Sequence, residues 1–280
     1  NLEEKYQLIL IDKNSYHTYT PLLYEIATTS KTTANQLKLK EIATYDLKNI
    51  FAGHKITVIN DLVTKLDLID GDVHLEKNRA MKFDYLVLAA GSEINYFGIP
   101  GLKENSLSLK SFLDSLKIRD AIWEKAQENI GKKEIKILIG GAGATGVELA
   151  GEIKSWLCEL EEELKKCPAS IILVEGASTV LPGFDERVIK RVARRLKEIG
   201  VDIILNEFIE RVEPGQTILK SGRLVNFDIL IWTGGVKAAS LIGALPLKKE
   251  IKGKVEVAGE MECLPQSPDL KLAGKIYGLG

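Results

Sequence analysis

The chain has 280 residues, of which 45% are hydrophobic and 28% are charged, and it carries a net charge of −1 from 38 basic and 39 acidic side chains. This length accommodates two modest domains with buried cores, and the balanced charge argues against a nucleic-acid partner. Three cysteines without a CxxC pair favour a reducing compartment and structural roles.

The first part of the chain alternates short apolar runs with polar turns. QLILID ends in Asp12 and predicts a buried parallel strand over 8–12. In a dinucleotide-binding βαβ unit, the second strand ends in an Asp or Glu whose carboxylate holds a ribose. Asp12 is therefore either part of a cofactor site or an ordinary surface acid. Further segments are a largely helical or irregular region over 22–48 and strands over 55–60, 62–69, 72–77 and 81–91.

The second part contains longer periodic segments in which apolar strands alternate with amphipathic helices, which predicts α/β architecture. Asp185 is the expected N-cap of a helix that Gly200 terminates. Helices are predicted over 112–129, 145–166 and 186–200, and strands over 134–140, 169–176, 201–206 and 227–235, with a meander before the last strand.

One layout occurs twice along the chain: a parallel strand ending in an acid, a meander, and a buried strand ending in a glycine turn. The two glycine turns close LVLAAG at 86–91 and LIWTGG at 230–235. We therefore predict two nested Rossmann-like nucleotide-binding domains of the α/β class, each with a parallel sheet and a β-meander. The first domain comprises 1–111 and 247–280, and the second comprises 112–246.

The stretch ILIGGAGATGVELAG, at 137–151, carries a GxGxxG pattern between a strand and a helix, and a strand ending in an acid follows. Gly141 permits the tight turn, Gly143 lets the backbone approach a pyrophosphate, and Gly146 allows the helix to pack on the strand. The pyrophosphate is expected at the helix N-terminus, beside Thr145. The alternative is a glycine turn that serves packing alone.

Two acidic residues accompany this turn. Glu175 is expected to accept hydrogen bonds from the adenosine ribose, which favours NAD(H) over NADP(H) because a 2′-phosphate would meet a carboxylate. Glu148 lies on the first turn of the helix. It is either close to the nicotinamide or a surface acid that complements the helix dipole.

The sequence resembles the type II NADH dehydrogenases, single-chain flavoproteins of the pyridine nucleotide-disulfide oxidoreductase superfamily. The resemblance covers essentially the whole chain. The stretches that carry it, in the family's order, are ILIDKNSYHTYTPLLYEIATT, LVLAAGSEINYFGIPG, ILIGGAGATGVELAGEI, ILVEGASTVLPGFDERV and ILIWTGGVKAASLI.

This resemblance implies that the first domain binds FAD and the second binds NADH. Hydride would pass from NADH to the flavin, and two electrons would then reach a quinone. The implied contacts are Asp12 at the FAD ribose, Pro21 and Leu22 beside the isoalloxazine, the Val63 backbone at the adenine, Ala90 and Gly91 at the flavin phosphates, and Gly234 and Gly235 beside NADH.

The sequence also departs from the family pattern. The family's FAD glycine-rich turn precedes QLILID, and its quinone pocket and membrane-binding helices follow the segment LAGKIYGLG, so truncation at both ends is expected. The alternatives are an NAD-binding fragment without redox activity and a ferredoxin or rubredoxin reductase-like flavoenzyme. For the intact protein the resemblance implies a cytoplasmic location, peripheral on the inner face of the cell membrane, and it is compatible with a homodimer. Three histidines at 17, 54 and 74 have no ligand spacing, so no metal is expected.

Overall fold

The computed structural model describes residues 2–30, 36–129, 134–164, 169–250, 253–272 and 274–279. The chain divides into two compact units. Unit 1 comprises Asn1–His17, Tyr45–Asn95 and Val236–Gly280, and unit 2 comprises Thr18–Thr44 and Tyr96–Gly235.

These units differ from the domain boundaries expected from the sequence, which lay at 111/112 and 246/247. The chain passes between units at 95/96 and 235/236, and Thr18–Thr44 belongs to unit 2 rather than to the first domain. The reason is tertiary packing: helix α2 (Leu23–Ala27) lies against α6 and α7 of unit 2, and its Ala27 is fully buried in the core of that unit.

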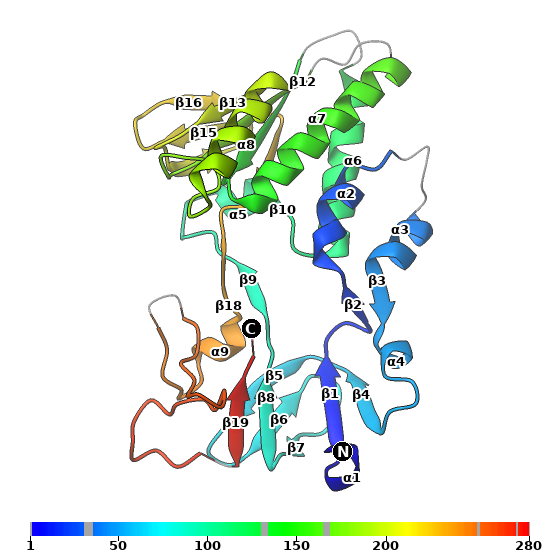
Figure 1. Cartoon of the computed structure of the whole chain (residues 1–280), viewed down its shortest axis with the longest axis vertical. Helices are drawn as coiled ribbons and strands as arrows, with labels where there is room; N and C mark the ends of the chain where they lie inside the picture. The colour runs from blue at the N-terminus through cyan, green and yellow to red at the C-terminus, as the bar shows by residue number, and fades with distance from the viewer. Residues whose placement is uncertain are drawn as a thin grey trace. The chain divides into compact units, whose positions relative to one another are not determined.

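Unit 2 is built on a five-stranded parallel sheet (Figure 1), which confirms the α/β class and the parallel sheet. Ile137 pairs with Ile171 on one side and with Ile229 on the other, so the middle strand is apolar and almost wholly buried. The strands in spatial order are β10 (Leu107–Ser108), β17 (Ile229–Trp232), β11 (Ile135–Gly140), β12 (Ala169–Val174) and β13 (Val201–Ile204).

The helices of unit 2 begin and end as their sequences indicate. Ser111 and Asp114 form a capping box at the start of α6 (Phe112–Glu128). The Asp185 carboxylate accepts a hydrogen bond from Arg187 N at 2.8 Å at the start of α8 (Glu186–Glu198), which confirms the predicted N-cap. The C-cap is Ile199, and Gly200 follows it in the left-handed conformation with a φ of 76°, one position beyond the predicted cap. The other helical elements are η1 (Thr20–Leu22), α3 (Gln36–Ala43), α5 (Leu102–Asn105) and α7 (Ala144–Leu164).

An antiparallel meander completes unit 2. It comprises β14 (Ile209–Glu213), β15 (Gln216–Leu219) and β16 (Leu224–Asn226). The core of the unit lies between its sheet and its helices. Large buried side chains of α6, α7 and β11 in this core include Ile118, Ile122, Ile135, Ile137, Ile139, Leu149, Ile153 and Trp156.

Unit 1 repeats part of this order: β1 (Leu8–Asp12) pairs in parallel with β4 (Ile56–Asn60), a three-stranded meander follows, and then comes β8 (Tyr85–Leu88). In the described residues β8 pairs in parallel only with β19 (Lys275–Gly278), while the Tyr6 and Tyr85 rings pack edge to face at 5.4 Å. The remaining elements are α1 (Leu2–Lys5), β2 (Tyr16–Thr18), β3 (Thr44–Asp46), α4 (Leu47–Ile50), β5 (Val63–Asp67), β6 (Asp72–Leu75), β7 (Met81–Lys82), β9 (Ser92–Ile94), β18 (Val236–Ala238) and α9 (Ser240–Gly243).

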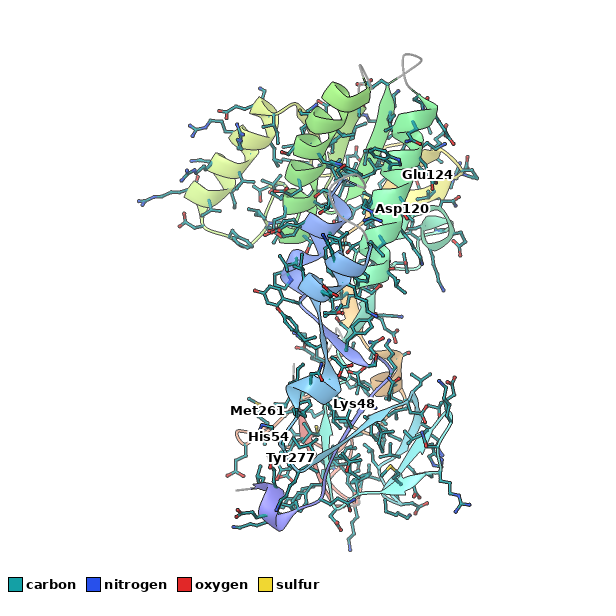
Figure 2. The ribbon with its side chains drawn as sticks, turned by 90° about the vertical axis from the view of Figure 1, so that its right-hand side faces the viewer. Lys48, His54, Asp120, Glu124, Met261 and Tyr277 are labelled. Atoms are coloured by element: carbon teal, nitrogen blue, oxygen red, sulfur yellow. The ribbon has the colours of Figure 1, made fainter. Side chains whose placement is uncertain are left out.

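The described cysteines are free thiols, and one histidine is paired with a carboxylate. Cys158 is exposed in unit 2 and Cys263 is buried in unit 1, whereas Cys167 lies outside the described residues. His54, labelled in Figure 2, shares a hydrogen bond through Nδ1 with Glu3 Oε1 at 2.9 Å. Across the described ranges we find no group of three or more His, Cys, Asp or Glu side chains able to hold a metal ion, and no helix long and apolar enough to cross a bilayer.

Candidate dinucleotide site

The turn between β11 and α7 requires glycine at its first position. Gly141 has a φ of 103°, and its N–H donates to the Val174 carbonyl oxygen at 2.8 Å. A Cβ on Gly141 would lie 2.8 Å from the Gly234 Cα, which belongs to the loop after β17. Backbone conformation and lack of space therefore both exclude a side chain here.

Gly146 lies on the first turn of α7, where the helix meets the same loop. A Cβ at this position would overlap the Gly141 carbonyl oxygen and lie 2.8 Å from the Thr233 Oγ1. The helix can approach the turn this closely only because residue 146 has no side chain.

Gly143 differs from both of these glycines. A Cβ there would meet no atom within 4 Å, and its φ lies outside the left-handed range. Nothing inside the described chain therefore requires glycine at this position. Its carbonyl accepts the first helical hydrogen bond, from Val147 N at 3.0 Å, so it adjoins the N–H groups at the start of α7. This open backbone at a helix N-terminus fits a pyrophosphate.

Glu175 follows β12 and fixes two loops through its carboxylate. Its Oε2 accepts a hydrogen bond from Ala142 N at 2.7 Å, and its Oε1 accepts one from Ala177 N at 2.8 Å. Each carboxylate oxygen has a second lone pair, so the side chain can still accept from a ribose hydroxyl. The carboxylate is half-buried and is held beside the glycine-rich turn.

The loop after β17 contributes Thr233, which the sequence analysis did not single out. Its hydroxyl donates a shared hydrogen bond to the carbonyl oxygens of Gly140 at 3.1 Å and Gly141 at 3.0 Å. Gly234 needs to be small because a Cβ there would overlap the Trp232 ring, and Gly235 lies beside Phe97. The sequence shows the WTGG motif, but no sequence pattern predicts that Thr233 contacts Gly141, which lies 92 residues earlier.

Glu148 and Thr145 are both exposed on the first turns of α7. Desolvation by the surrounding protein raises the pKa of Glu148 above its ordinary value, although part of the side chain reaches solvent. Tyr24 of α2 lies close to it: burial raises the pKa of Tyr24, and the charges of Glu25, Glu148 and Glu152 raise it further. The resemblance implied that the stretch from Tyr16 to Tyr24 runs beside the isoalloxazine, but it did not pair Tyr24 with Glu148 and Glu152, which lie on another helix.

The residues expected at the flavin fall into different units. Asp12, Val63, Ala90 and Gly91 belong to unit 1, whereas Pro21 and Leu22 form part of η1 in unit 2. The Asp12 Oδ1 accepts from Asn14 N at 2.8 Å, and the Asp12 carbonyl oxygen accepts from Asn60 Nδ2 at 3.0 Å. Asp12 thus ends β1 in an orientation fixed by its own turn, with Oδ2 available to a further donor.

The turn, the helix N-terminus and the acid after the second strand define a dinucleotide-binding protein of the Rossmann type. The chain belongs to the pyridine nucleotide-disulphide oxidoreductase family, whose model matches residues 2–267.

Curated relatives confirm the resemblance seen in the sequence. A type II NADH:quinone oxidoreductase of Haemophilus influenzae is 29% identical over 85% of this chain and 60% of its own length. The corresponding protein of Mycobacterium tuberculosis is 29% identical over 95% of this chain and 59% of its own length. The chain therefore spans about three-fifths of the length of these relatives.

Solved structures show the same fold. The structure of NDH2 from Plasmodium falciparum in complex with NADH matches with a TM-score of 0.85 at 21% identity, covering 99% of this chain and 60% of that one. The sulfide:quinone oxidoreductase of Aquifex aeolicus matches with a TM-score of 0.77 at 18% identity, covering 100% of this chain and 63% of that one.

Proposed function

We propose that this chain carries the nucleotide-binding units of an FAD-dependent NADH dehydrogenase, in which hydride passes from NADH to the flavin and electrons continue to a quinone. The observation that carries the NADH part is Gly143, which has open space and no internal requirement for glycine beside the N-terminus of α7. The names of the curated relatives support the quinone part, and membership of the pyridine nucleotide-disulphide oxidoreductase family supports the flavin part.

The residues of unit 2 would bind and orient NADH. The N–H groups at the start of α7, with Gly143 and Thr145, would hold the pyrophosphate, where the helix dipole favours negative charge. Glu175 would accept from the adenosine ribose. Gly234 and Gly235, in the loop after β17, would lie beside the nicotinamide end, as the family resemblance implies. Glu148 would lie near the nicotinamide, on an early turn of α7.

FAD, when bound, supplies two-electron chemistry that no side chain provides. Asp12 would hold its ribose, the Val63 backbone its adenine, and Ala90 with Gly91 its phosphates. A Cβ at Gly91 would meet nothing within 4 Å, so this turn is open to a ligand, as at Gly143. Pro21 and Leu22 would lie beside the ring system.

An absorption experiment tests the flavin proposal. The 280-residue chain is incubated with excess FAD, passed through gel filtration and examined for a retained flavin band. We expect a band that NADH bleaches under anaerobic conditions. Asp12→Ala should reduce the retained flavin, whereas Asp269→Ala, at an exposed acid of the same unit, should not. Unchanged flavin retention in Asp12→Ala would show that Asp12 does not hold the FAD ribose.

A second candidate is an NAD(H)-binding module without redox activity. It is favoured by the strand, glycine-rich turn and long helix that follow one another in unit 2. NADH binding by a chain that retains no flavin would select this candidate. A third candidate, a ferredoxin or rubredoxin reductase-like enzyme, is separated by acceptor: reduction of a ferredoxin but not of a quinone would select it.

The cellular setting follows from the same proposal. A quinone is a membrane-soluble acceptor, so we place the protein peripherally on the inner face of the cell membrane. Flotation with vesicles tests that placement, and sedimentation velocity tests whether the protein is a homodimer.

A further inference from the structure

The order of strands in unit 2 fixes where the adenine of a bound dinucleotide must lie. Strands β11, β12 and β13 are adjacent, and neighbouring strands are about 4.8 Å apart. The glycine-rich turn follows β11 and Glu175 follows β12. A cofactor with its pyrophosphate on the first and its ribose on the second therefore extends its adenine over the loop that follows β13.

That loop is tied tightly to the ribose-binding acid. Glu175 N donates to the Ile204 carbonyl oxygen at 2.8 Å, and Glu207 N donates to the Glu175 carbonyl oxygen at 3.1 Å. Asn206 N donates to the Ala177 carbonyl oxygen at 3.0 Å. These three backbone hydrogen bonds hold the segment 205–208 beside Glu175.

Phe208 is the last residue of this segment, and its ring lies against Gly176. A Cβ at Gly176 would stand 2.6 Å from the Phe208 Cζ and 2.8 Å from its Cδ1, so the ring covers the backbone immediately after Glu175. The backbone of Phe208 is also anchored, since its carbonyl oxygen accepts from Lys220 N at 2.9 Å.

The ring is nevertheless open to solvent. Phe208 is 55% exposed, and the Lys220 ammonium stands 5.1 Å from the ring centroid on an exposed, flexible side chain that can move aside. Phe208 therefore combines a backbone held by a hydrogen bond with a solvent-exposed ring. Such a ring can stack on the flat face of a purine.

We propose that Phe208 binds the adenine ring of NADH by stacking, and so positions the cofactor from its adenosine end. This inference rests on the proposed NADH binding and adds a contact that lies 33 residues after the ribose-binding acid. It also explains why residue 176 is a glycine, since a side chain there would displace the Phe208 ring.

Two variants separate stacking from simple covering of Gly176. Phe208→Ala removes the ring, and Phe208→Leu keeps an apolar side chain over Gly176 but has no aromatic face. Leu224→Ala, which removes a 58% exposed side chain from β16 of the same unit, is the matched control. Dissociation constants are measured by titration calorimetry for NADH, for ADP-ribose, which lacks the nicotinamide, and for reduced nicotinamide mononucleotide, which lacks the adenosine.

We expect both Phe208 variants to bind NADH and ADP-ribose roughly tenfold more weakly, the range typical of one aromatic–base stack. Their affinity for the mononucleotide, and all affinities of Leu224→Ala, should match the wild type, and Phe208→Trp should restore binding. Normal binding by Phe208→Leu would overturn the inference, as would an equal loss for the mononucleotide. If the wild-type chain bound neither NADH nor ADP-ribose, the proposed function itself would fail, and this inference with it.

Discussion

The same substitution should affect stability at one glycine of the α7 turn and cofactor binding at another. Gly146→Ala places a methyl group against the Gly141 carbonyl oxygen and 2.8 Å from the Thr233 Oγ1, which are backbone and a hydrogen-bonded hydroxyl rather than a flexible side-chain end. Gly143→Ala places the same methyl group where no atom lies within 4 Å.

The magnitudes follow from these surroundings. Overpacking at Gly146 costs about 1–3 kcal/mol and displacing the Thr233 hydroxyl about 1 kcal/mol more, while alanine returns up to about 1 kcal/mol of helix propensity. The net loss of about 1–3 kcal/mol corresponds to a fall in Tm of roughly 3–10 °C. Gly143→Ala should change stability by no more than about 1 kcal/mol, the scale of an N-cap replacement.

Gly143→Ala, which should barely change stability, should instead weaken NADH binding. Its methyl group would keep the pyrophosphate from the helix N-terminus, and one lost hydrogen bond to a charged group weakens binding at least about tenfold. Thermal unfolding followed by circular dichroism and titration with NADH measure the two effects. The reasoning is refuted if Gly143→Ala binds NADH normally, or if it lowers Tm as much as Gly146→Ala.

Three further predictions concern carboxyl groups. Glu175→Gln should lower Tm, because the amide cannot accept from both Ala142 N and Ala177 N, and should weaken NADH binding about tenfold; unchanged affinity would contradict the ribose assignment. Since the pKa of Glu148 is raised above its ordinary 4.5, its charged form costs stability, so Glu148→Gln should be more stable than the wild type at pH 7. The stability difference between Glu148→Gln and the wild type should vanish in thermal melts at a pH below this ordinary pKa. A difference that persists there would show that the charge of Glu148 is not its cause. Burial alone would raise the pKa of Asp61, but hydrogen bonds from the Asn78 side chain and from the backbone of residues 62, 77 and 78 outweigh it and lower the pKa below 3.8. Its stabilisation is present above that ordinary value and is lost as pH falls through the lowered one, so Asp61→Asn should destabilise at pH 7 and progressively less in acid; a pH-independent difference would contradict this.

Local signals predicted the parts of the fold that depend on neighbours in sequence. The apolar runs gave the parallel strands, Asp185 gave the start of α8, and the GxGxxG spacing gave the turn before α7. In each case the determining contacts lie within a few residues, where periodicity and capping chemistry are informative.

Features that depend on distant contacts were not predictable in this way. The hydroxyl of Thr233 reaches a carbonyl 92 residues away, and Phe208 meets Gly176 only because β12 and β13 are adjacent. The compact units differ from the expected domains for the same reason, since α2 joins unit 2 through packing on helices far along the chain. Hydrophobic pattern shows that α2 is buried but not against which core.

The most direct measurement is a fluorescence titration of the 280-residue chain with NADH and, separately, with NADPH. The central claim is that unit 2 binds NAD(H) through the α7 turn and Glu175. It predicts saturable binding of one NADH per chain, displaced by ADP-ribose, and binding of NADPH at least about tenfold weaker because its 2′-phosphate meets the Glu175 carboxylate. Absence of saturable NADH binding, or equal affinity for NADPH, would contradict it.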